Sequence, residues 1–255
     1  MSLLKVTNLG KSFGGVKAVD GISFELAAGE LLALIGPNGA GKTTAFNMIT
    51  GVYQPTSGRI RFSGKDTLRI KPNRLAAVGI ARTFQNIRLF ASLSVIDNIR
   101  VAARLHYGQG YFSALWRGKS WRNAEAETEK NALELLEIFD LASQRDELAI
   151  SLPYGDQRRL EIVRALATQP KLLLLDEPAA GMNPSEKDDL MRLIRFIKQH
   201  FQLAILLVEH DMKVVMGICE RIAVLEYGIK IAEGTPKEIQ NHPKVIEAYL
   251  GAGAS

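Results

Sequence analysis

The chain has 255 residues, 47% hydrophobic and 23% charged, which is typical of an ordinary folded protein with a substantial core. Its net charge of +5 permits a nucleic acid, a nucleotide or an anionic membrane as partner and identifies none of them. No apolar run approaches the roughly 18 residues that span a bilayer, no secretory leader is visible, and the single cysteine, Cys219, excludes an internal disulfide, so we expect a cytosolic protein.

The N-terminal region predicts two kinds of strand. Residues 3–35 alternate apolar and polar positions before the apolar run "LLALIG", which favours an antiparallel strand patch leading into a buried strand. Residues 43–50 indicate a helix, and residues 58–64 a further strand. From about residue 94 to 150 the apolar residues recur at spacings of three and four, which predicts a helical segment.

The C-terminal region predicts a parallel sheet. Two apolar runs, 171–178 and 203–211, flank the amphipathic stretch 184–200, and strand, helix and strand in that order are typical of parallel pairing. Residues 221–236 indicate a hairpin before a short terminal helix, and Cys219 lies in an apolar stretch, where we expect an inert buried thiol. We therefore predict an α/β fold with a mostly parallel sheet, an antiparallel β patch and an inserted α-helical subdomain.

A glycine-rich loop carries the clearest chemical signal. The segment "GPNGAGKTT" follows a predicted buried strand, precedes a predicted helix and has the spacing of a phosphate-binding loop. Glycines let successive backbone N–H groups face phosphate oxygens, Lys42 reaches the outer phosphates, and Thr43 offers a hydroxyl to Mg²⁺. The residues that we expect to bind nucleotide here are Gly36, Pro37, Asn38, Gly39, Ala40, Gly41, Lys42, Thr43 and Thr44.

Polar residues also follow the buried strands. Asp176 and Glu177 end the first leucine-rich run, where Asp176 is placed to hold Mg²⁺ and Glu177 to polarise an attacking water; two adjacent acids could instead cap the next helix. His210 ends the next strand, beside Glu177 in the predicted sheet, although a strand-end histidine can be structural. Gln85 lies where the core gives way to the helical segment, a position that also suits a surface glutamine.

The stretch "SLPYGDQRRLEIVRAL", residues 151–166, predicts a helix whose start suits an anion. A proline, a glycine and an acid precede two arginines, Arg158 and Arg159. The unpaired N–H groups and the dipole at a helix N-terminus attract negative charge. The alternative is a helix that is merely well capped.

Together these motifs resemble the ATP-binding cassette family, the ATPase subunits of ABC transporters, across essentially the whole chain. Several stretches resemble one branch, the ATPases of branched-chain amino acid importers, and in particular the longer of their two paired subunits: "RTFQNIRLF", "LPYGDQRRLEI", "DEPAAGMNP", "VEHDMKVVMGI" and "HPKVIEAYLGA". The resemblance implies a P-loop NTPase core in residues 1–86 and 161–236, a helical signature subdomain in 87–160 and a C-terminal tail in 237–255.

The resemblance assigns roles to single residues. It implies that Lys42 lies in the Walker A loop, that Asp176 belongs to Walker B and that Glu177 is the catalytic glutamate, with His210 as the switch histidine. Gln85 becomes the Q-loop residue, so that the implied Mg²⁺ ligands are Thr43, Gln85 and Asp176. Phe13 matches the aromatic residue that stacks on adenine, although by its sequence it could equally be core. Asn183 stands where the family usually has Asp.

The signature segment would serve a second cassette. In the family two cassettes join head to tail, and each signature covers the γ-phosphate held by the other chain. The implied residues are Leu152, Pro153, Tyr154, Gly155, Asp156 and Gln157. Because Pro153 replaces Ser, Tyr154 replaces Gly and Asp156 replaces Gln in the usual motif, we expect a weaker contact here.

The resemblance implies an enzyme that hydrolyses ATP with Mg²⁺ and powers a separate membrane permease from the inner face of the cytoplasmic membrane. A second cassette, identical or different, completes the dimer, a substrate-binding protein acts indirectly through the permease, and no nucleic acid is expected. A soluble assembly ATPase is the alternative, whereas a GTPase would need an Asn-Lys-x-Asp motif that the sequence lacks. Residues 104–127 interleave aromatic and basic residues and suit RNA binding or, as we favour, a partner-facing or self-packed loop.

Overall fold

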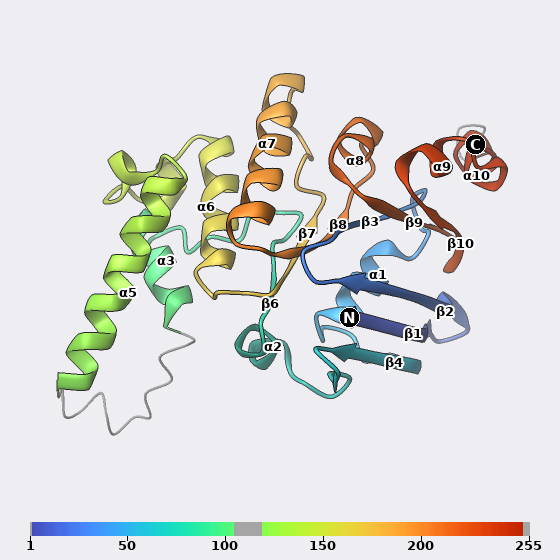
Figure 1. Cartoon of the computed structure of the whole chain (residues 1–255), viewed down its shortest axis with the longest axis horizontal. Helices are drawn as coiled ribbons and strands as arrows, with labels where there is room; N and C mark the ends of the chain where they lie inside the picture. The colour runs from blue at the N-terminus through green and yellow to red at the C-terminus, as the bar shows by residue number, and fades with distance from the viewer. Residues whose placement is uncertain (1, 105–118, 252–255) are drawn as a thin grey trace. The chain divides into compact units, whose positions relative to one another are not determined.

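The computed structural model describes residues 2–104 and 119–251, and Figure 1 traces its elements in chain order. Two compact units are present, the first made of Met1–Leu75 and Lys171–Ser255 and the second of Ala76–Pro170. The chain leaves the first unit and returns to it, so the second unit is an insertion. The finer boundaries expected at residues 87, 161 and 237 stay predictions.

An antiparallel sheet in the first unit has the strand order β2-β1-β4-β5. Its strands are β1 (Ser2–Phe13), β2 (Val16–Ala27), β4 (Ser57–Phe62) and β5 (Lys65–Asp66). Residues alternate between the two faces, so that Leu4, Phe24 and Phe62 are buried while Lys5 and Arg61, Cα partners across β1 and β4, are exposed. The predicted antiparallel patch is confirmed.

A second sheet of the same unit contains the predicted parallel strands, in the order β10-β9-β3-β8-β7. Its strands are β3 (Leu31–Ile35), β7 (Leu172–Asp176), β8 (Ala204–Val208), β9 (Arg221–Glu226) and β10 (Ile229–Gly234). Strand β3 is parallel to β8 and β9, β7 is parallel to β8, and β9 with β10 forms the predicted hairpin. Every residue of β3, β7 and β8 is buried, which is why these strands read as continuous apolar runs.

Three helices of the first unit, α7 (Pro184–His200), α8 (Met212–Ile218) and α9 (Pro236–Gln240), begin at side-chain caps. The other helices described in this unit are α1 (Lys42–Ile49) and α10 (Pro243–Gly251), and α2 (Pro72–Val78) begins in it. The side chain of Asn183 accepts hydrogen bonds from the N–H groups of Ser185 and Glu186, and Asp211 and Thr235 cap α8 and α9 in a similar way. Asn183 therefore fulfils the capping role that Asp would have.

The second unit is mainly helical. Its elements are β6 (Ile80–Arg82), α3 (Val95–Ala103), α5 (Lys119–Ile138), two short 3₁₀ turns (Ala142–Gln144 and Ala149–Ser151) and α6 (Tyr154–Leu166). Ile99, Leu136 and Leu160, one from each long helix, are fully buried. The predicted helical segment is thus confirmed, though as separate helices and turns. The proposed loop within residues 104–127 lies mostly outside the described residues.

Two expectations from the sequence can be compared with the structure, one about the thiol of Cys219 and one about membrane-spanning segments. Cys219 is buried, and burial raises the pKa of its thiol far above the usual range, so it stays protonated and inert, as expected. Over residues 2–104 and 119–251, no helix is both long enough and apolar enough to cross a membrane.

Candidate functional site

The glycine-rich loop connects β3 to α1 through a backbone that only glycine can adopt. Gly36 and Gly41 have φ of 150° and 96°. A Cβ atom on Gly36 would lie 2.1 Å from the carbonyl oxygen of Leu225, and one on Gly41 would lie 2.5 Å from that of Ala18. Gly41 is also the N-cap of α1 and brings no side chain to bond the first N–H groups of this helix. Those N–H groups form an anion-binding end.

Lys42 lies folded over the same loop. Its Nζ donates hydrogen bonds to the carbonyl oxygens of Gly36, at 2.7 Å, and Pro37, at 2.9 Å. Burial lowers the pKa of the ammonium group, and the carboxylate of Glu177 opposes that shift. The ammonium group of Lys42 therefore lies against the backbone of the phosphate loop, close enough to Glu177 for the two charges to attract each other.

The end of β7 carries the two predicted acids. Asp176 is buried as the last residue of the strand. Glu177 has φ of 44°, a left-handed conformation that is strained for a residue with a side chain, and its N–H donates to the carbonyl oxygen of Val208 at 2.8 Å. The Nδ1 atom of His210 lies 3.7 Å from Oε2 of Glu177. The structure thus brings together Glu177 and His210, as the sequence predicted.

A third acid, Glu209, has its Oε2 atom 3.8 Å from Nδ1 of His210. The sequence interpretation missed it. Its side chain is fully buried. Oε1 accepts a hydrogen bond from the N–H of Ala179 at 2.9 Å, and Oε2 accepts from the N–H groups of His210 and Asp211 at 2.8 and 3.1 Å. Glu209 therefore joins the loop after β7 to the loop after β8. The available signal was a charged residue directly after the buried run of β8.

The loop that holds His210 is fixed on its other side by an ion pair. Nζ of Lys187, on α7, lies 2.6 Å from Oδ2 of Asp211. Oδ1 of Asp211 accepts hydrogen bonds from the N–H groups of Lys213 and Val214. The hydrogen bond from Lys187 holds the pKa of Asp211 below its usual range. The backbone on each side of His210 is thus restrained while its ring stays exposed.

Phe13, the proposed adenine-stacking residue, is not part of the core. It ends β1 with 45% of its surface exposed. Its ring meets that of Tyr53 edge to face at a centroid distance of 5.3 Å, and Nζ of Lys11 lies 5.1 Å from its centroid. An exposed aromatic ring beside a cation suits a flat π-system as its ligand.

The implied Mg²⁺ ligands divide between the units. Thr43 is exposed in the first turn of α1, Asp176 ends β7, and Gln85 belongs to the second unit. Oxygen donors of this kind suit Mg²⁺, which commonly binds one or two protein ligands together with phosphate oxygens. In the described part of the chain, no group of three or more His, Cys, Asp or Glu side chains could hold a metal ion alone.

In the second unit, the backbone around Gln85 is bonded to a buried ion pair of α6. Arg158 and Glu161 lie 2.9 Å apart and are each only 1% exposed. Arg158 donates to the carbonyl oxygens of Phe84, at 2.7 Å, and Gln85, at 2.8 Å. Oε1 of Glu161 accepts from the N–H groups of Phe84 and Arg88. This pair fixes the backbone conformation on both sides of Gln85.

Arg158, the first of the two arginines in residues 151–166, brings no unpaired charge to the start of α6. Its charge is matched by Glu161 inside the unit. Arg159 donates to the carbonyl oxygen of Phe139 at 3.2 Å and lies 3.7 Å from a carboxylate oxygen of Asp156. Both guanidinium groups bind partners within their own unit, because a buried or half-buried charge is stable only when it is paired.

The start of α6 is open where the signature contact is expected. Pro153 is the N-cap and Tyr154 the first helical residue, and Tyr154 is exposed. A Cβ atom on Gly155 would meet no heavy atom of the described chain within 4 Å, so the fold itself does not require glycine there. Asp156 pairs with Arg159, which offsets part of the negative charge expected to repel phosphate.

Gln157 and Leu152 complete this segment. Nε2 of Gln157 donates to the carbonyl oxygen of Leu152 at 2.8 Å, so the side chain folds back over the residues that precede α6. This bond fixes the entry of the chain into the helix. The part of the segment left open to a partner is therefore the first turn, at Tyr154 and Gly155.

Comparisons with known proteins agree with this geometry. A family model described as ABC transporter matches residues 19–180, and one described as branched-chain amino acid ATP-binding cassette transporter matches residues 230–255. The chain is 47% identical over 249 residues to the high-affinity branched-chain amino acid transport ATP-binding protein LivG of Escherichia coli, with 98% of both chains covered. It is 43% identical to the corresponding BraF protein of Pseudomonas aeruginosa, again over 98% of both chains.

Solved structures show the same fold. The crystal structure of the ADP conformation of an ATP-binding cassette of an ABC transporter matches with a TM-score of 0.85 and 34% identity, covering 98% of this chain and 99% of that chain. The match therefore includes the phosphate loop, the strand-end acids and the helical insertion. With the family model covering more than half of the sequence, the chain belongs to the ABC transporter family of ATP-binding cassettes.

Proposed function

We propose that this chain hydrolyses ATP to power the import of branched-chain amino acids through separate membrane permease subunits. The observation that carries the proposal is the convergence, within one unit, of the phosphate loop, Glu177 and His210 in a chain 47% identical to a protein named for that transport. The amino acid itself would not touch this subunit.

The proposed division of labour follows from the contacts. Lys42 and the N–H groups at the start of α1 bind the outer phosphates, and Phe13 stacks on adenine. Glu177 accepts a proton from the attacking water, which His210 helps to orient, and Glu209 keeps the backbone of the two loops in register. Mg²⁺, held by Thr43 and Asp176, would offset charge that develops on the phosphoryl group.

We also propose that ATP closes a dimer of cassettes, in which the first turn of α6 covers the nucleotide of a second cassette. Pro153 lacks the hydroxyl of the usual motif, and Asp156 adds a carboxylate that Arg159 offsets only in part. These features support pairing with a different cassette rather than with a second copy. The inner face of the cytoplasmic membrane is the expected location, with the substrate-binding protein reached only through the permease and no nucleic acid involved.

The dimer proposal is tested by trapping. Glu177→Gln should bind ATP without turning it over, and its mass in solution with ATP should increase at much lower protein concentration when the second ATPase of the same transporter is added. A tight homodimer of the variant alone, unchanged by Pro153→Ser with Asp156→Gln, would contradict unequal pairing.

The transport proposal is tested by reconstitution. The chain should co-purify in detergent with permease subunits, and proteoliposomes containing them with the second cassette should take up leucine only with ATP and loaded substrate-binding protein. Lys42→Ala in the same complex should abolish uptake while the complex still assembles. Co-purification with soluble partners and no permease would instead favour the alternative, a soluble assembly ATPase.

A further inference from the structure

Residues 59–74, which we call the basic segment, carry a dense positive charge. The segment contains one acid, Asp66, and six cations, whose balance of +5 equals that of the whole chain, so the remaining residues are neutral in sum. The six cations are Arg59, Arg61, Lys65, Arg69, Lys71 and Arg74.

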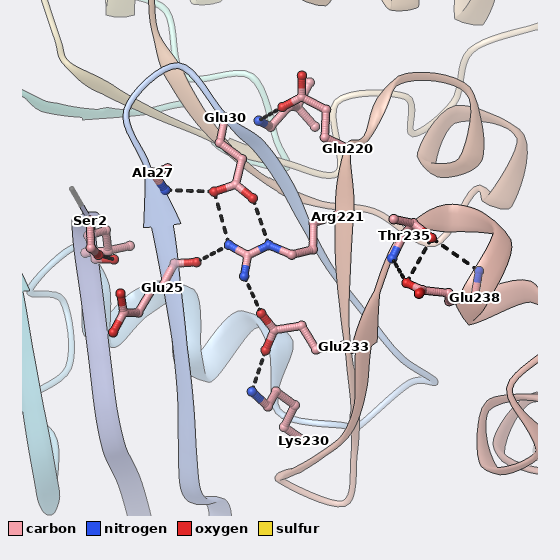
Figure 2. A network of polar contacts seen from close by, with 12 residues as sticks. Ser2, Glu25, Ala27, Glu30, Glu220, Arg221, Lys230, Glu233, Thr235 and Glu238 are labelled. Atoms are coloured by element: carbon pink, nitrogen blue, oxygen red, sulfur yellow. Dashed lines mark hydrogen bonds and ion pairs between the residues drawn. The ribbon is translucent and has the colours of Figure 1, made fainter.

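These cations differ from others in how they are partnered. All six are exposed, and among the described residues none of their side chains makes a hydrogen bond or an ion pair. Several other cations of the same unit pair with acids: Figure 2 shows Arg221 bonded to both Glu30 and Glu233. Lys5 likewise pairs with Glu25, next to the basic segment on the same sheet.

The fold explains why the basic segment faces solvent. On β4, Ile60 and Phe62 point into the core, so the alternate residues Arg59 and Arg61 must lie on the other face. Strand β5 forms the edge of the sheet. After it the chain leads into the start of α2, which Figure 1 labels. A charge on an edge strand also discourages unwanted strand pairing, which accounts for Lys65 but not for the cations beyond the sheet.

We propose that the basic segment binds the surface of an anionic phospholipid membrane. Unpaired like charges close together raise the local potential and attract polyanions. Nucleic acid is less well suited, because the sole aromatic residue of the segment, Phe62, is fully buried and no ring is available to stack on a base. Membership of a transporter family supplies a nearby lipid surface.

The expected strength follows from electrostatics. Each Lys or Arg near an anionic bilayer increases partitioning by about fivefold, and the attraction extends about 10 Å at moderate salt. Binding should therefore require anionic lipid and weaken as salt is added. The inference goes beyond the proposed function, and its measurement does not involve ATP turnover.

The experiment is sedimentation of the purified chain with vesicles of phosphatidylcholine, with or without phosphatidylglycerol, at low and high salt. The test variant combines Lys65→Gln, Arg69→Gln and Lys71→Gln. We expect the parent to bind only vesicles with phosphatidylglycerol, and the test variant to bind on the order of 100-fold more weakly. Circular dichroism checks that the variant is folded.

A matched control distinguishes an effect of the basic segment from an effect of the protein's net charge. Lys171, Lys237 and Lys244 are also exposed, and in the described structure their side chains have no ion-pair partner. Their combined change to Gln alters the net charge equally and should leave vesicle binding within a few-fold of the parent. Equal loss in both triple variants, binding that ignores phosphatidylglycerol, or binding to a single-stranded oligonucleotide but not to vesicles would overturn the proposal.

Discussion

The buried pair on α6 offers a direct test of how the second unit is held together. In Arg158→Met the side chain keeps a similar length but loses its charge and its bonds to Glu161, Phe84 and Gln85. Glu161 would then remain at 1% exposure without its cation, keeping only the N–H groups that donate to it.

The magnitude follows from that isolation. Removing one partner of a buried ion pair typically costs 3–5 kcal/mol, because the other charge stays desolvated, and we expect about that loss in the free energy of unfolding. Against a typical total of about 5–15 kcal/mol, such a loss brings the unit close to unfolding. Replacing both residues by apolar ones, in Arg158→Met with Glu161→Met, should recover part of it, since no charge is left buried.

The assay is urea denaturation followed by circular dichroism, with hydrogen exchange to localise the weakened region to Ala76–Pro170. The neighbouring Arg159→Met is the matched control: its guanidinium group is 35% exposed and pairs with Asp156 at only 3.7 Å, so its loss should cost no more than about 1 kcal/mol. If the two single variants destabilise the protein equally, the buried pair does not hold the backbone as argued.

Three further changes probe the first unit. Glu177→Gln should still bind ATP but hydrolyse it at least ~100-fold more slowly in a turnover assay, and an unchanged rate would show that Glu177 is not the base. Phe13→Ala should weaken ATP affinity by roughly 1–3 kcal/mol in calorimetry, and equal affinities would rule out stacking. Asp211→Asn keeps the cap of α8 but loses the charge that Lys187 stabilises. The folded-state pKa of Asp211 is lowered, so this stabilisation is present above about pH 4 and is lost as the pH falls through the folded-state pKa. The urea midpoints of parent and variant should therefore differ at pH 7 and converge in acid. A difference that stays constant with pH would refute this.

Much of the architecture could be predicted from the sequence because the responsible forces are local or act on whole segments. Strands β3, β7 and β8 are buried on both faces, so each is a continuous apolar run that few other structures accommodate. The phosphate loop could be predicted equally well. At Gly36 and Gly41 other chain segments lie too close for a Cβ atom, so only glycine fits, and glycines at this spacing are visible in the sequence. Glu177 and His210 were paired correctly because the ends of adjacent parallel strands lie side by side.

The tertiary structure alone decided what the buried polar groups bind. Arg158 is one of two consecutive arginines at a helix start, and nothing local indicates that it donates to Phe84 and Gln85, more than seventy residues away, rather than to an anion. Glu209 looks like an ordinary strand-end acid, yet it bonds the backbone of the loop that follows β7. A charged side chain can form its hydrogen bonds with water, with a ligand or with distant backbone. Only the folded structure determines which of these partners it binds.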